Sequence, residues 1–319
     1  MWKISSGVFL GWTLGANDSA NIFGTGVSTG TVKYRTAILL TAVFVLAGSI
    51  LEGGKCMKTI SGLSLILPMD AFCSTLAAAI TMAILTCFAL PASTSQAIIG
   101  AVIGAGMVSG SADFSQLYKI ISCWIFTPIS GIVLGYLLHR LLGYILDRTV
   151  KSITYRNLLY STGIIMAGCY GAYSLGSNNA ANVTGVYVGS GMLSADMAAL
   201  IGGISIAAGA LTYSKKVMIT IGKGIVPLDP FSAFVVVLAE AVTLHIFTQI
   251  GVPVSSSQAV VGSVVGVGFV GSLTTVSAKM LAKISLGWLL TPVCAGLLTY
   301  LMIRCITGSL VRGLFPVFG

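Results

Sequence analysis

The stretch Gly15-Ala16-Asn17-Asp18-Ser19-Ala20-Asn21 places a carboxylate and two carboxamides inside an otherwise apolar run. A second stretch, Gly176-Ser177-Asn178-Asn179-Ala180-Ala181-Asn182, repeats this pattern 161 residues later. Charged and amide groups are costly in a membrane-spanning segment, and they usually mark a substrate or ion pathway. A polar cluster that occurs once in each half of a chain predicts a two-fold site at the interface between two repeats.

The composition is that of an integral membrane protein. Of the 319 residues, 56% are hydrophobic and only 8% are charged, whereas a soluble globular domain carries about 25% charged residues. The net charge of +9 comes from 17 lysines and arginines that are spread over short loops. They are typical of juxtamembrane charge, and no basic run with interleaved aromatic residues suggests a nucleic-acid partner. We expect a multi-pass protein of the cell (plasma or inner) membrane, embedded in the lipid bilayer.

The repeat extends over the whole chain. Pro91-Ala92-Ser93-Thr94-Ser95-Gln96 is matched by Pro253-Val254-Ser255-Ser256-Ser257-Gln258, and Thr127-Pro128 is matched by Thr291-Pro292. Five such landmarks recur with offsets between 159 and 164 residues. The sequence therefore predicts a first repeat at 1–142, a charged linker at 143–157 and a second repeat at 158–319, which together form one transport unit.

Each half is predicted to hold four full spans and one re-entrant hairpin. The spans cover 4–29, 36–54, 71–89 and 117–142 in the first half, and 158–192, 197–214, 231–250 and 284–306 in the second. The first span of each half is expected to be broken at its polar motif, where protein or water can satisfy unwound backbone. The apolar run after the tip at Ser93–Gln96 has only 12 residues, and a full crossing needs about 20.

The relative orientation of the halves is the open point of this prediction. Lys33 and Arg35 follow the first span, whereas only Asp196 follows its counterpart, and this difference favours opposite orientations. Inverted halves need an odd number of crossings, but four spans and a returning hairpin give an even number. We predict an all-α polytopic membrane protein with two inverted repeats, discontinuous helices and a re-entrant helical hairpin in each half, and we expect one segment of the count to be misassigned.

The two asparagine-rich motifs are the candidate cation site. Carboxylate, carboxamide and freed backbone carbonyl oxygens suit a small cation such as Na⁺, and a discontinuous helix supplies such carbonyls. The candidate ligands are Asn17, Asp18, Asn21, Asn178, Asn179 and Asn182, with Na⁺ expected at Asp18 and Asn178. The structural alternative is that the asparagines cap a kinked helix.

The two hairpin tips are the candidate anion site. A serine-rich run just before a helix offers hydroxyl donors together with free backbone N–H groups and the partial positive charge of the helix N-terminus. The candidate residues are Ser93, Thr94, Ser95, Gln96, Ser255, Ser256, Ser257 and Gln258. Two facing tips would hold one tetrahedral oxyanion between them, whereas ordinary helix capping is the structural alternative.

Other ionisable residues lie in or near the spans. Glu240 and His245 are five residues apart and would suit a proton relay. Together with Glu52 they do not occupy equivalent repeat positions, so we favour the alternative that each is paired or interfacial. The sequence holds no Ser-His-Asp set, no HExxH motif and no metal-ligand cluster, so we expect a protein that is not an enzyme and that needs no cofactor beyond a coupling ion.

These residues resemble the inorganic phosphate transporter (PiT) family. That family carries a Gly-Ala-Asn-Asp-x-Ala-Asn signature in each half, seen here at Gly15–Asn21 and Gly176–Asn182, and serine- and threonine-rich hairpin tips, seen here at Pro91–Ser95 and Pro253–Ser257. The resemblance implies a cation-coupled symporter with inverted repeats that forms a homodimer and moves inorganic phosphate with Na⁺ or H⁺.

Two departures from the family pattern bear on the substrate and the coupling ion. Asn179 stands where the second signature usually has an aspartate, and Gln96 and Gln258 stand where a histidine is common. A sulfate-permease branch of the family resembles the chain at Asn178-Asn179. The expected function is import of inorganic phosphate by alternating access. A proton-coupled sulfate permease is the first alternative, and a passive anion channel or a non-transporting membrane scaffold is the second.

Overall fold

The structure, a computed structural model, describes residues 2–87, 92–224, 228–270 and 278–307, and these residues form helices and no strand. The helices of the first half are η1 (Trp2–Ile4), α1 (Ser5–Ser28), α2 (Tyr34–Glu52), η2 (Gly53–Cys56), α3 (Met57–Ser61), α4 (Pro68–Cys87), α5 (Thr94–Ser109) and α6 (Phe114–Thr149). The second half contains α7 (Ile153–Gly189), α8 (Ala195–Tyr213), α9 (Lys215–Gly224), α10 (Pro230–Ile250), α11 (Ser256–Gly268) and α12 (Ala278–Ile306). Pro91 and the end of the predicted span 71–89 lie outside the described residues.

Short polar side chains define where several helices begin. The Asp113 carboxylate accepts hydrogen bonds from the backbone N–H groups of Ser115 and Gln116 at the start of α6. The Ser115 hydroxyl also donates to this carboxylate, and these hydrogen bonds lower the pKa of Asp113. Asp229 caps α10 in the same way, and Pro230 follows it at the first helical position, where a missing N–H costs nothing.

The helices α4 and α5 are the two limbs of one re-entrant hairpin. The residues before α4 and after α5 meet at the same end of the molecule, where Ser64 Oγ lies 2.8 Å from Ser111 Oγ and the Asp113 N–H donates to the Leu63 carbonyl oxygen at 2.9 Å. In the second half Asp229, before α10, and Val270, after α11, line one cavity. Each hairpin therefore returns to the side from which it started.

This arrangement corrects the predicted count of four full spans and a hairpin in each half. The predicted spans 71–89 and 231–250 are first limbs of hairpins, so α1, α2 and α6 remain as crossings of the first half, an odd number. By length and composition six described helices are able to cross a membrane, and α4 and α10 are among them. Hydropathy and length cannot separate such a limb from a full span, which is why the count was wrong.

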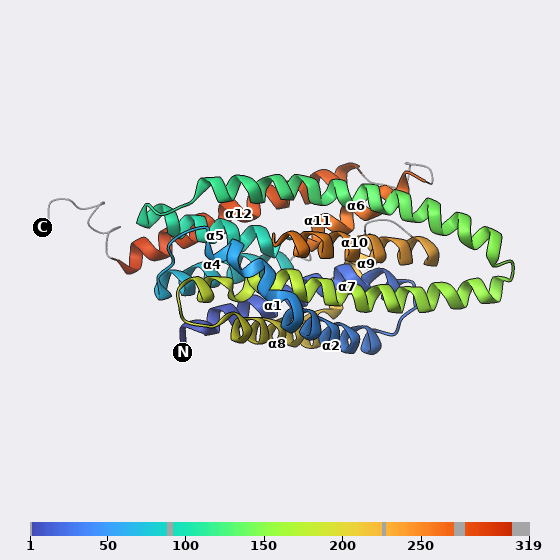
Figure 1. Ribbon diagram of the computed structural model, residues 1–319, viewed down its shortest axis with the longest axis horizontal. Helices are drawn as coiled ribbons and strands as arrows, with labels where there is room; N and C mark the ends of the chain where they lie inside the picture. Colours follow the sequence, from blue (N-terminus) through green and yellow to red (C-terminus); the bar gives the residue numbers. More distant parts are fainter. Residues whose placement is uncertain (1, 88–91, 225–227, 271–277, 308–319) are drawn as a thin grey trace, which may run out of the picture.

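The two halves are inverted. In Figure 1, α6 runs along the long axis in one direction, and α12, its counterpart in the repeat, runs in the opposite direction. The predicted fold class, an all-α polytopic membrane protein with inverted repeats and a re-entrant hairpin in each half, is confirmed. The boundaries of the repeats at 142 and 158 stay predictions, although α6 ends at Thr149 and α7 begins at Ile153.

The predicted breaks at the polar motifs are wrong, because α1 and α7 run through them as continuous helices. The motif glycines serve close packing instead of unwinding. A Cβ atom on Gly15 would collide with the backbone carbonyl of Ile206, and one on Gly176 would collide with that of Val45. The discontinuities lie at the hairpin tips, between α4 and α5 and between α10 and α11.

The glycine contacts show that helices of one half pack on helices of the other. Gly15 and Gly176 join α1 to α8 and α7 to α2, and these two contacts are equivalent in the repeat. Gly100 of α5 packs on the Pro292 backbone of α12, and Gly262 of α11 packs on the Pro128 backbone of α6. Small residues at such crossings allow two helix backbones to approach closely in a membrane.

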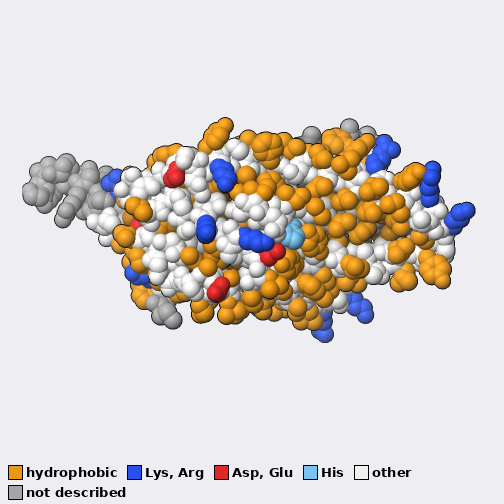
Figure 2. All heavy atoms as spheres, in the orientation of Figure 1, with side chains coloured by type: hydrophobic (Ala, Val, Ile, Leu, Met, Phe, Trp, Pro, Cys, Tyr) orange, Lys and Arg blue, Asp and Glu red, His pale blue; other side chains and the backbone are white. Residues whose placement is uncertain are grey.

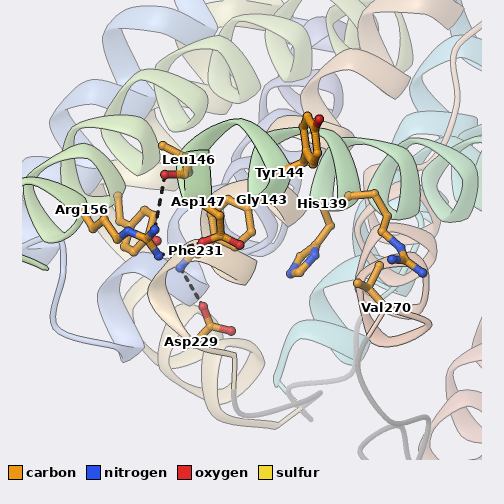
Figure 3. A pocket seen from close by; sticks show the side chains of 11 residues that line it. His139, Gly143, Tyr144, Leu146, Asp147, Arg156, Asp229, Phe231 and Val270 are labelled. Carbon is orange, nitrogen blue, oxygen red and sulfur yellow. Dashed lines mark hydrogen bonds and ion pairs between the residues drawn. The ribbon is translucent and has the colours of Figure 1, made fainter. Parts of the chain in front are cut away.

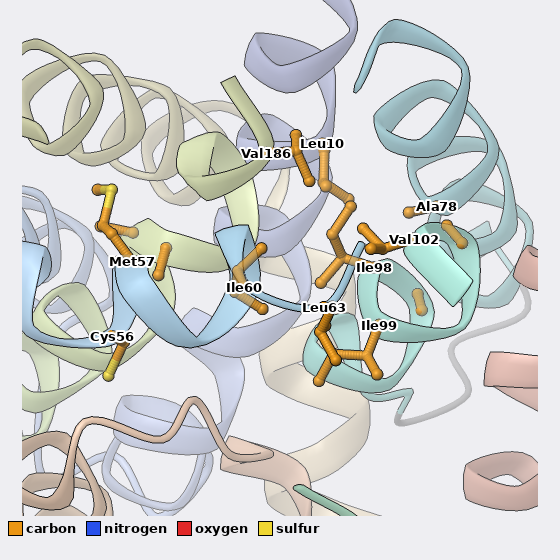
Figure 4. Packing of buried hydrophobic residues seen from close by; sticks show 14 of the residues in the cluster. Leu10, Cys56, Met57, Ile60, Leu63, Ala78, Ile98, Ile99, Val102 and Val186 are labelled. Carbon is orange, nitrogen blue, oxygen red and sulfur yellow. The ribbon is translucent and has the colours of Figure 1, made fainter. Parts of the chain in front are cut away.

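A cluster of buried apolar side chains supports the first hairpin. Leu10 of α1, Leu63 before α4, Ile98 and Val102 of α5 and Val186 of α7 pack together beside the tip (Figure 4). Since lipid is as apolar as these side chains, the packing is stabilised mainly by van der Waals contact rather than by exclusion of water. This cluster fixes α5, and therefore the first tip, against α1 and α7.

The outer surface fits a bilayer. Figure 2 shows an apolar band with Lys and Arg side chains on both sides of it along the long axis. Large apolar side chains such as Leu39, Val43, Leu289 and Val293 are exposed. The protein is a multi-pass membrane protein.

Candidate functional site

The two hairpin tips meet in the middle of the molecule. The Ser95 hydroxyl, on the first tip, donates a hydrogen bond of 2.7 Å to the Val254 carbonyl oxygen on the second tip. All eight predicted tip residues are buried, and the most exposed of them, Gln258, has only 5% of its surface accessible. The tips therefore form one polar region that is closed to solvent.

The first polar motif contacts the second tip. The Ser256 hydroxyl donates to Asp18 Oδ2 at 3.0 Å, and it accepts a hydrogen bond of 3.0 Å from Asn21 Nδ2. Asp18 and Asn21 lie one turn apart on α1, so their side chains share one face of the helix. Asn17 points to α4 instead, where its Nδ2 donates to Thr86 Oγ1 at 3.0 Å.

The second polar motif contacts the first tip in a similar way. Asn182 Nδ2 donates to Ser95 Oγ at 2.7 Å and to Asn179 Oδ1 at 2.8 Å. Each tip is therefore bound by the polar motif of the opposite half. Six of the predicted cation and anion residues are brought together as two mixed clusters, one of Asp18, Asn21 and Ser256 and one of Ser95, Asn179 and Asn182.

Asn178 holds the second hairpin in place. Its Oδ1 accepts a hydrogen bond of 2.9 Å from the Val254 N–H, and its Nδ2 donates to Thr248 Oγ1 at 3.0 Å and to the Val252 carbonyl oxygen at 3.3 Å. This single amide connects α7 to the end of α10 and to the non-helical segment before α11. Both ends of the Asn178 amide are occupied by protein groups.

The first serine of each tip is a helix cap. Ser93 Oγ accepts from the Gln96 N–H at 3.3 Å, and Ser255 Oγ accepts from the Gln258 N–H at 3.2 Å. Helix capping, the structural alternative considered for the tips, is therefore the role of these two hydroxyls. Ser257 accepts a hydrogen bond of 3.2 Å from the Trp288 indole N–H, a contact that the sequence did not indicate.

Several buried polar atoms of the site have no hydrogen-bond partner among the described residues. They are Asn17 Oδ1, Asp18 Oδ1, Asn21 Oδ1, Thr94 Oγ1, Gln96 Oε1, Asn179 Nδ2, Asn182 Oδ1 and Gln258 Oε1. Buried polar atoms in folded proteins are nearly always hydrogen-bonded. A concentration of such atoms around two helix N-termini is typical of a site that binds a polar or charged ligand.

The ionisable residues noted in or near the spans, which are Glu52, Glu240 and His245, divide into two kinds. Glu52 and His245 are paired, with Glu52 Oε2 3.1 Å from His245 Nε2, and Tyr170 Oη lies 2.7 Å from His245 Nδ1. The paired role that we favoured is confirmed for these two residues. It is wrong for Glu240, which is buried and has no hydrogen-bond partner in the described part of the chain.

A separate cavity of about 500 Å³ lies at one end of the molecule and does not include the predicted site. Figure 3 shows it between the end of α6, the start of α7 and the start of α10, with His139, Asp147, Arg156 and Asp229 among its side chains. Arg156 is paired with Asp147 at 2.9 Å, and Asp229 caps α10. Arg156, Asp147 and Asp229 are therefore engaged in structural contacts.

The comparison with known families fits the two motif-bearing halves. A family model described as the phosphate transporter family matches residues 14–160 and again residues 147–299. The chain belongs to the phosphate transporter family. The family membership that the motifs indicated is thus confirmed, and this family consists of transporters rather than enzymes.

Relatives within the family carry two substrate names. The chain is 30% identical over 304 residues to the sulfate permease CysP of Bacillus subtilis, an alignment covering 93% of this chain and 85% of the relative. It is 31% identical over 300 residues to a Methanocaldococcus jannaschii protein named as a phosphate permease, covering 93% and 95% of the two chains.

A solved structure shares the fold. It is described as the sodium-dependent phosphate transporter, and it superposes with a TM-score of 0.83 at 21% identity, covering 96% of this chain and 98% of that one. The likeness extends over both repeats and both hairpins, and it shows the architecture of this family member.

Proposed function

We propose that this family member is a cation-coupled secondary symporter that imports inorganic phosphate across the membrane by alternating access. The observation that carries the proposal is the meeting of two helix N-termini, those of α5 and α11, inside a buried polar region. Each N-terminus contributes about half a positive charge together with unpaired backbone N–H groups. Two of them facing one point form an anion site that needs no lysine or arginine.

The anion-binding residues proposed are the eight tip residues predicted from the sequence. Ser93 and Ser255 contribute indirectly, because their hydroxyl oxygens cap the helices. Thr94 has a buried hydroxyl that no described residue binds, and because a hydroxyl can donate to an anion, it is the side chain best placed to contact one. The unbound atoms of Gln96 and Gln258 are their amide oxygens, which accept hydrogen bonds and would bind the proton of a protonated phosphate. Ser95, Ser256 and Ser257 link the tips to the motifs and to Trp288.

The cation site proposed is centred on Asp18. A buried carboxylate beside an anionic substrate needs a positive charge, and carboxylate and carbonyl oxygens suit a small hard cation. Asp18, Asn17 and Asn21 each have a side-chain oxygen without a partner among the described residues. Asn179 and Asn182 complete the polar lining, whereas Asn178 binds the hairpin backbone, so the case for Na⁺ is stronger at Asp18 than at Asn178.

The crossed contacts suit alternating access. Each tip is bound by the polar motif of the other half, so a rocking motion of one half against the other would change both contacts together. A homodimer, as the resemblance implies, is part of the proposal, and the mass of the protein in nanodiscs tests it. A chain that remains monomeric at all concentrations would contradict this part alone.

Proton-coupled sulfate transport is the second candidate. It is favoured by Asn179, which removes one acid from the site, and by the 30% identity to a sulfate permease. Phosphate near neutral pH retains a proton that it can donate to an acceptor such as Asp18, whereas sulfate only accepts hydrogen bonds. A passive channel or a scaffold remains the third possibility.

Uptake of radiolabelled phosphate into proteoliposomes tests the proposal, with Na⁺ and H⁺ gradients imposed separately and sulfate added as a competitor. We expect saturable phosphate uptake that requires a cation gradient and resists sulfate. Uptake that follows the proton gradient and is blocked by sulfate would establish the second candidate. Uptake without any cation gradient and without saturation would identify a channel, and no uptake would identify a scaffold.

A further inference from the structure

We infer that Glu240 of α10 forms a second cation-binding group, which works beside Asp18 in the transport site. The inference rests on the proposed symport and adds a coupling residue to it. Neither motif contains Glu240, and the residue 161 positions earlier is Ala79. The group is therefore a feature of the second half alone.

Glu240 is the most isolated acid in the described part of the protein. Only 1% of its surface is accessible, and neither carboxylate oxygen has a hydrogen-bond partner there. An ionised carboxylate that is buried without partners is strongly unfavourable. The carboxylate thus needs a positive charge, or a proton, that the described residues do not supply.

The charged side chains on the neighbouring helices are already used. His245 follows Glu240 by five residues, which turns it about 140° around the helix, and it binds Glu52 and Tyr170. Lys55, beside α10, pairs with Glu52 at 3.1 Å. His139 of α6 lies at the opposite end of α10, where its ring contacts Ser232, and α11 contains no ionisable residue.

Asp18 of α1 is the ionisable group whose charge acts on Glu240, and α1 packs against α10. Their charges repel, so the pair is stable only with a cation between or beside them. Asp18 Oδ1 and Asn21 Oδ1, both buried and without a described partner, add oxygen ligands on the same side of α1. Asn21 is 2% exposed, so this second polar group is enclosed with the acids.

The position of Glu240 explains how a chain with Asn179 keeps two acids in its site. The second motif lacks a carboxylate, and α10, which packs against α7 and α1, supplies one from a different helix. The number of cations carried with each anion then depends on Asp18 and Glu240 rather than on two equivalent motif aspartates. Na⁺ and H⁺ share the chemistry that this site requires, which is neutralisation of a carboxylate.

The test measures how many charges move with each anion in proteoliposomes that contain the full chain. Anion flux and transported charge are recorded together, in one series with Na⁺ varied at fixed pH and in another with pH varied without Na⁺. We expect Glu240→Gln to lower the ratio of cations to anions by one while anion exchange across the membrane continues. If the anion flux of Glu240→Gln no longer depends on Na⁺, the cation at Glu240 is Na⁺. If its flux no longer depends on pH, the cation is H⁺.

Matched variants separate a coupling role from a structural one. Thr243→Val, one turn away on α10, removes a buried hydroxyl that donates to the Ala239 carbonyl oxygen of its own helix, and it is expected to keep the wild-type ratio. Glu240→Asp retains the charge and is expected to keep the ratio while weakening cation affinity about 3–10-fold. If Glu240→Gln does not fold, an unchanged cation affinity in Glu240→Asp would overturn the inference.

The failures of the two proposals are distinguishable. A wild-type protein whose uptake ignores both cations would overturn the symport proposal and this inference together. A coupled wild-type protein with the same cation-to-anion ratio in Glu240→Gln would overturn the inference and leave the symport proposal intact.

Discussion

Two serines of the site, Ser256 and Ser95, make the same pattern of contacts with different chemistry. Ser256 accepts from Asn21 and donates to a carboxylate, that of Asp18. Ser95 accepts from Asn182 and donates to a carbonyl oxygen, that of Val254. In the repeat Ser256 is matched by Thr94, and Ser95 is matched by Ser257. The two clusters are therefore similar in their contacts without being repeat copies, and the charge is present in only one of them. A symmetric fold of this kind can bind a cation asymmetrically.

The largest expected effect is the removal of that charge. Asp18→Asn should reduce cation-driven uptake by at least 100-fold, because the Ser256 cluster then becomes as neutral as the Ser95 cluster and no longer attracts a cation. Radiolabelled uptake with an imposed gradient measures the change, and gel filtration checks that the variant is folded. Full coupled uptake by this variant would remove Asp18 from the cation site.

Asn178 and Asn17, which are equivalent in the repeat, should differ in stability. Asn178→Ala removes the acceptor of the Val254 N–H and the donor to Thr248 and to the Val252 carbonyl oxygen, and an unsatisfied buried group costs about 1–3 kcal/mol. Asn17→Ala removes one hydrogen bond, to Thr86, and should cost about 1 kcal/mol. Thermal unfolding in detergent should give the larger loss for Asn178→Ala; equal losses would contradict the structural role given to it.

Alanine at the two serines compares the clusters directly. Ser256→Ala removes a hydrogen bond to a charged group, worth about 1.5–3 kcal/mol, whereas Ser95→Ala removes neutral bonds worth about 1 kcal/mol each. We expect the cation concentration for half-maximal uptake to rise roughly 10–100-fold for Ser256→Ala, and to rise less for Ser95→Ala. The reverse order would show that the charge does not control the cation affinity.

The smallest effect concerns the two equivalent tryptophans beside the hairpins. The Trp288 indole N–H donates to Ser257, whereas the Trp124 indole N–H has no partner among the described residues. Trp288→Phe should weaken anion affinity about 5-fold, the value of one neutral hydrogen bond, and Trp124→Phe should leave it unchanged. Competition with unlabelled anion gives both affinities, and equal values would show that the indole contact is not used.

The sequence predicted the repeat, the hairpin tips and the meeting of the polar motifs because these depend on residue type and spacing. It did not predict that α1 and α7 are continuous, because Gly15 and Gly176 are equally suited to breaking a helix and to packing against one. The role of α4 was missed because a hairpin limb of 20 residues has the hydropathy of a full span.

The site residues themselves show where a sequence becomes insufficient. Ser93 and Thr94 are neighbours with similar side chains, yet one caps α5 and the hydroxyl of the other has no partner in the described part of the chain. Glu240 was noticed as an acid in a span, but only the structure shows that His245 faces Glu52 instead. Side-chain direction and partner choice depend on the three-dimensional packing of helices that are distant in sequence.

The close packing of α5 on α12 has a consequence for how the protein is made. Gly100 leaves the ribosome about 190 residues before Pro292, against which it packs. At a synthesis rate of about 5–20 residues per second, the first hairpin waits roughly 10–40 s for this partner. During that interval the polar tip of the nascent chain lies in the lipid or the insertion machinery without its packing partner. The residues of the tips therefore affect membrane insertion as well as transport.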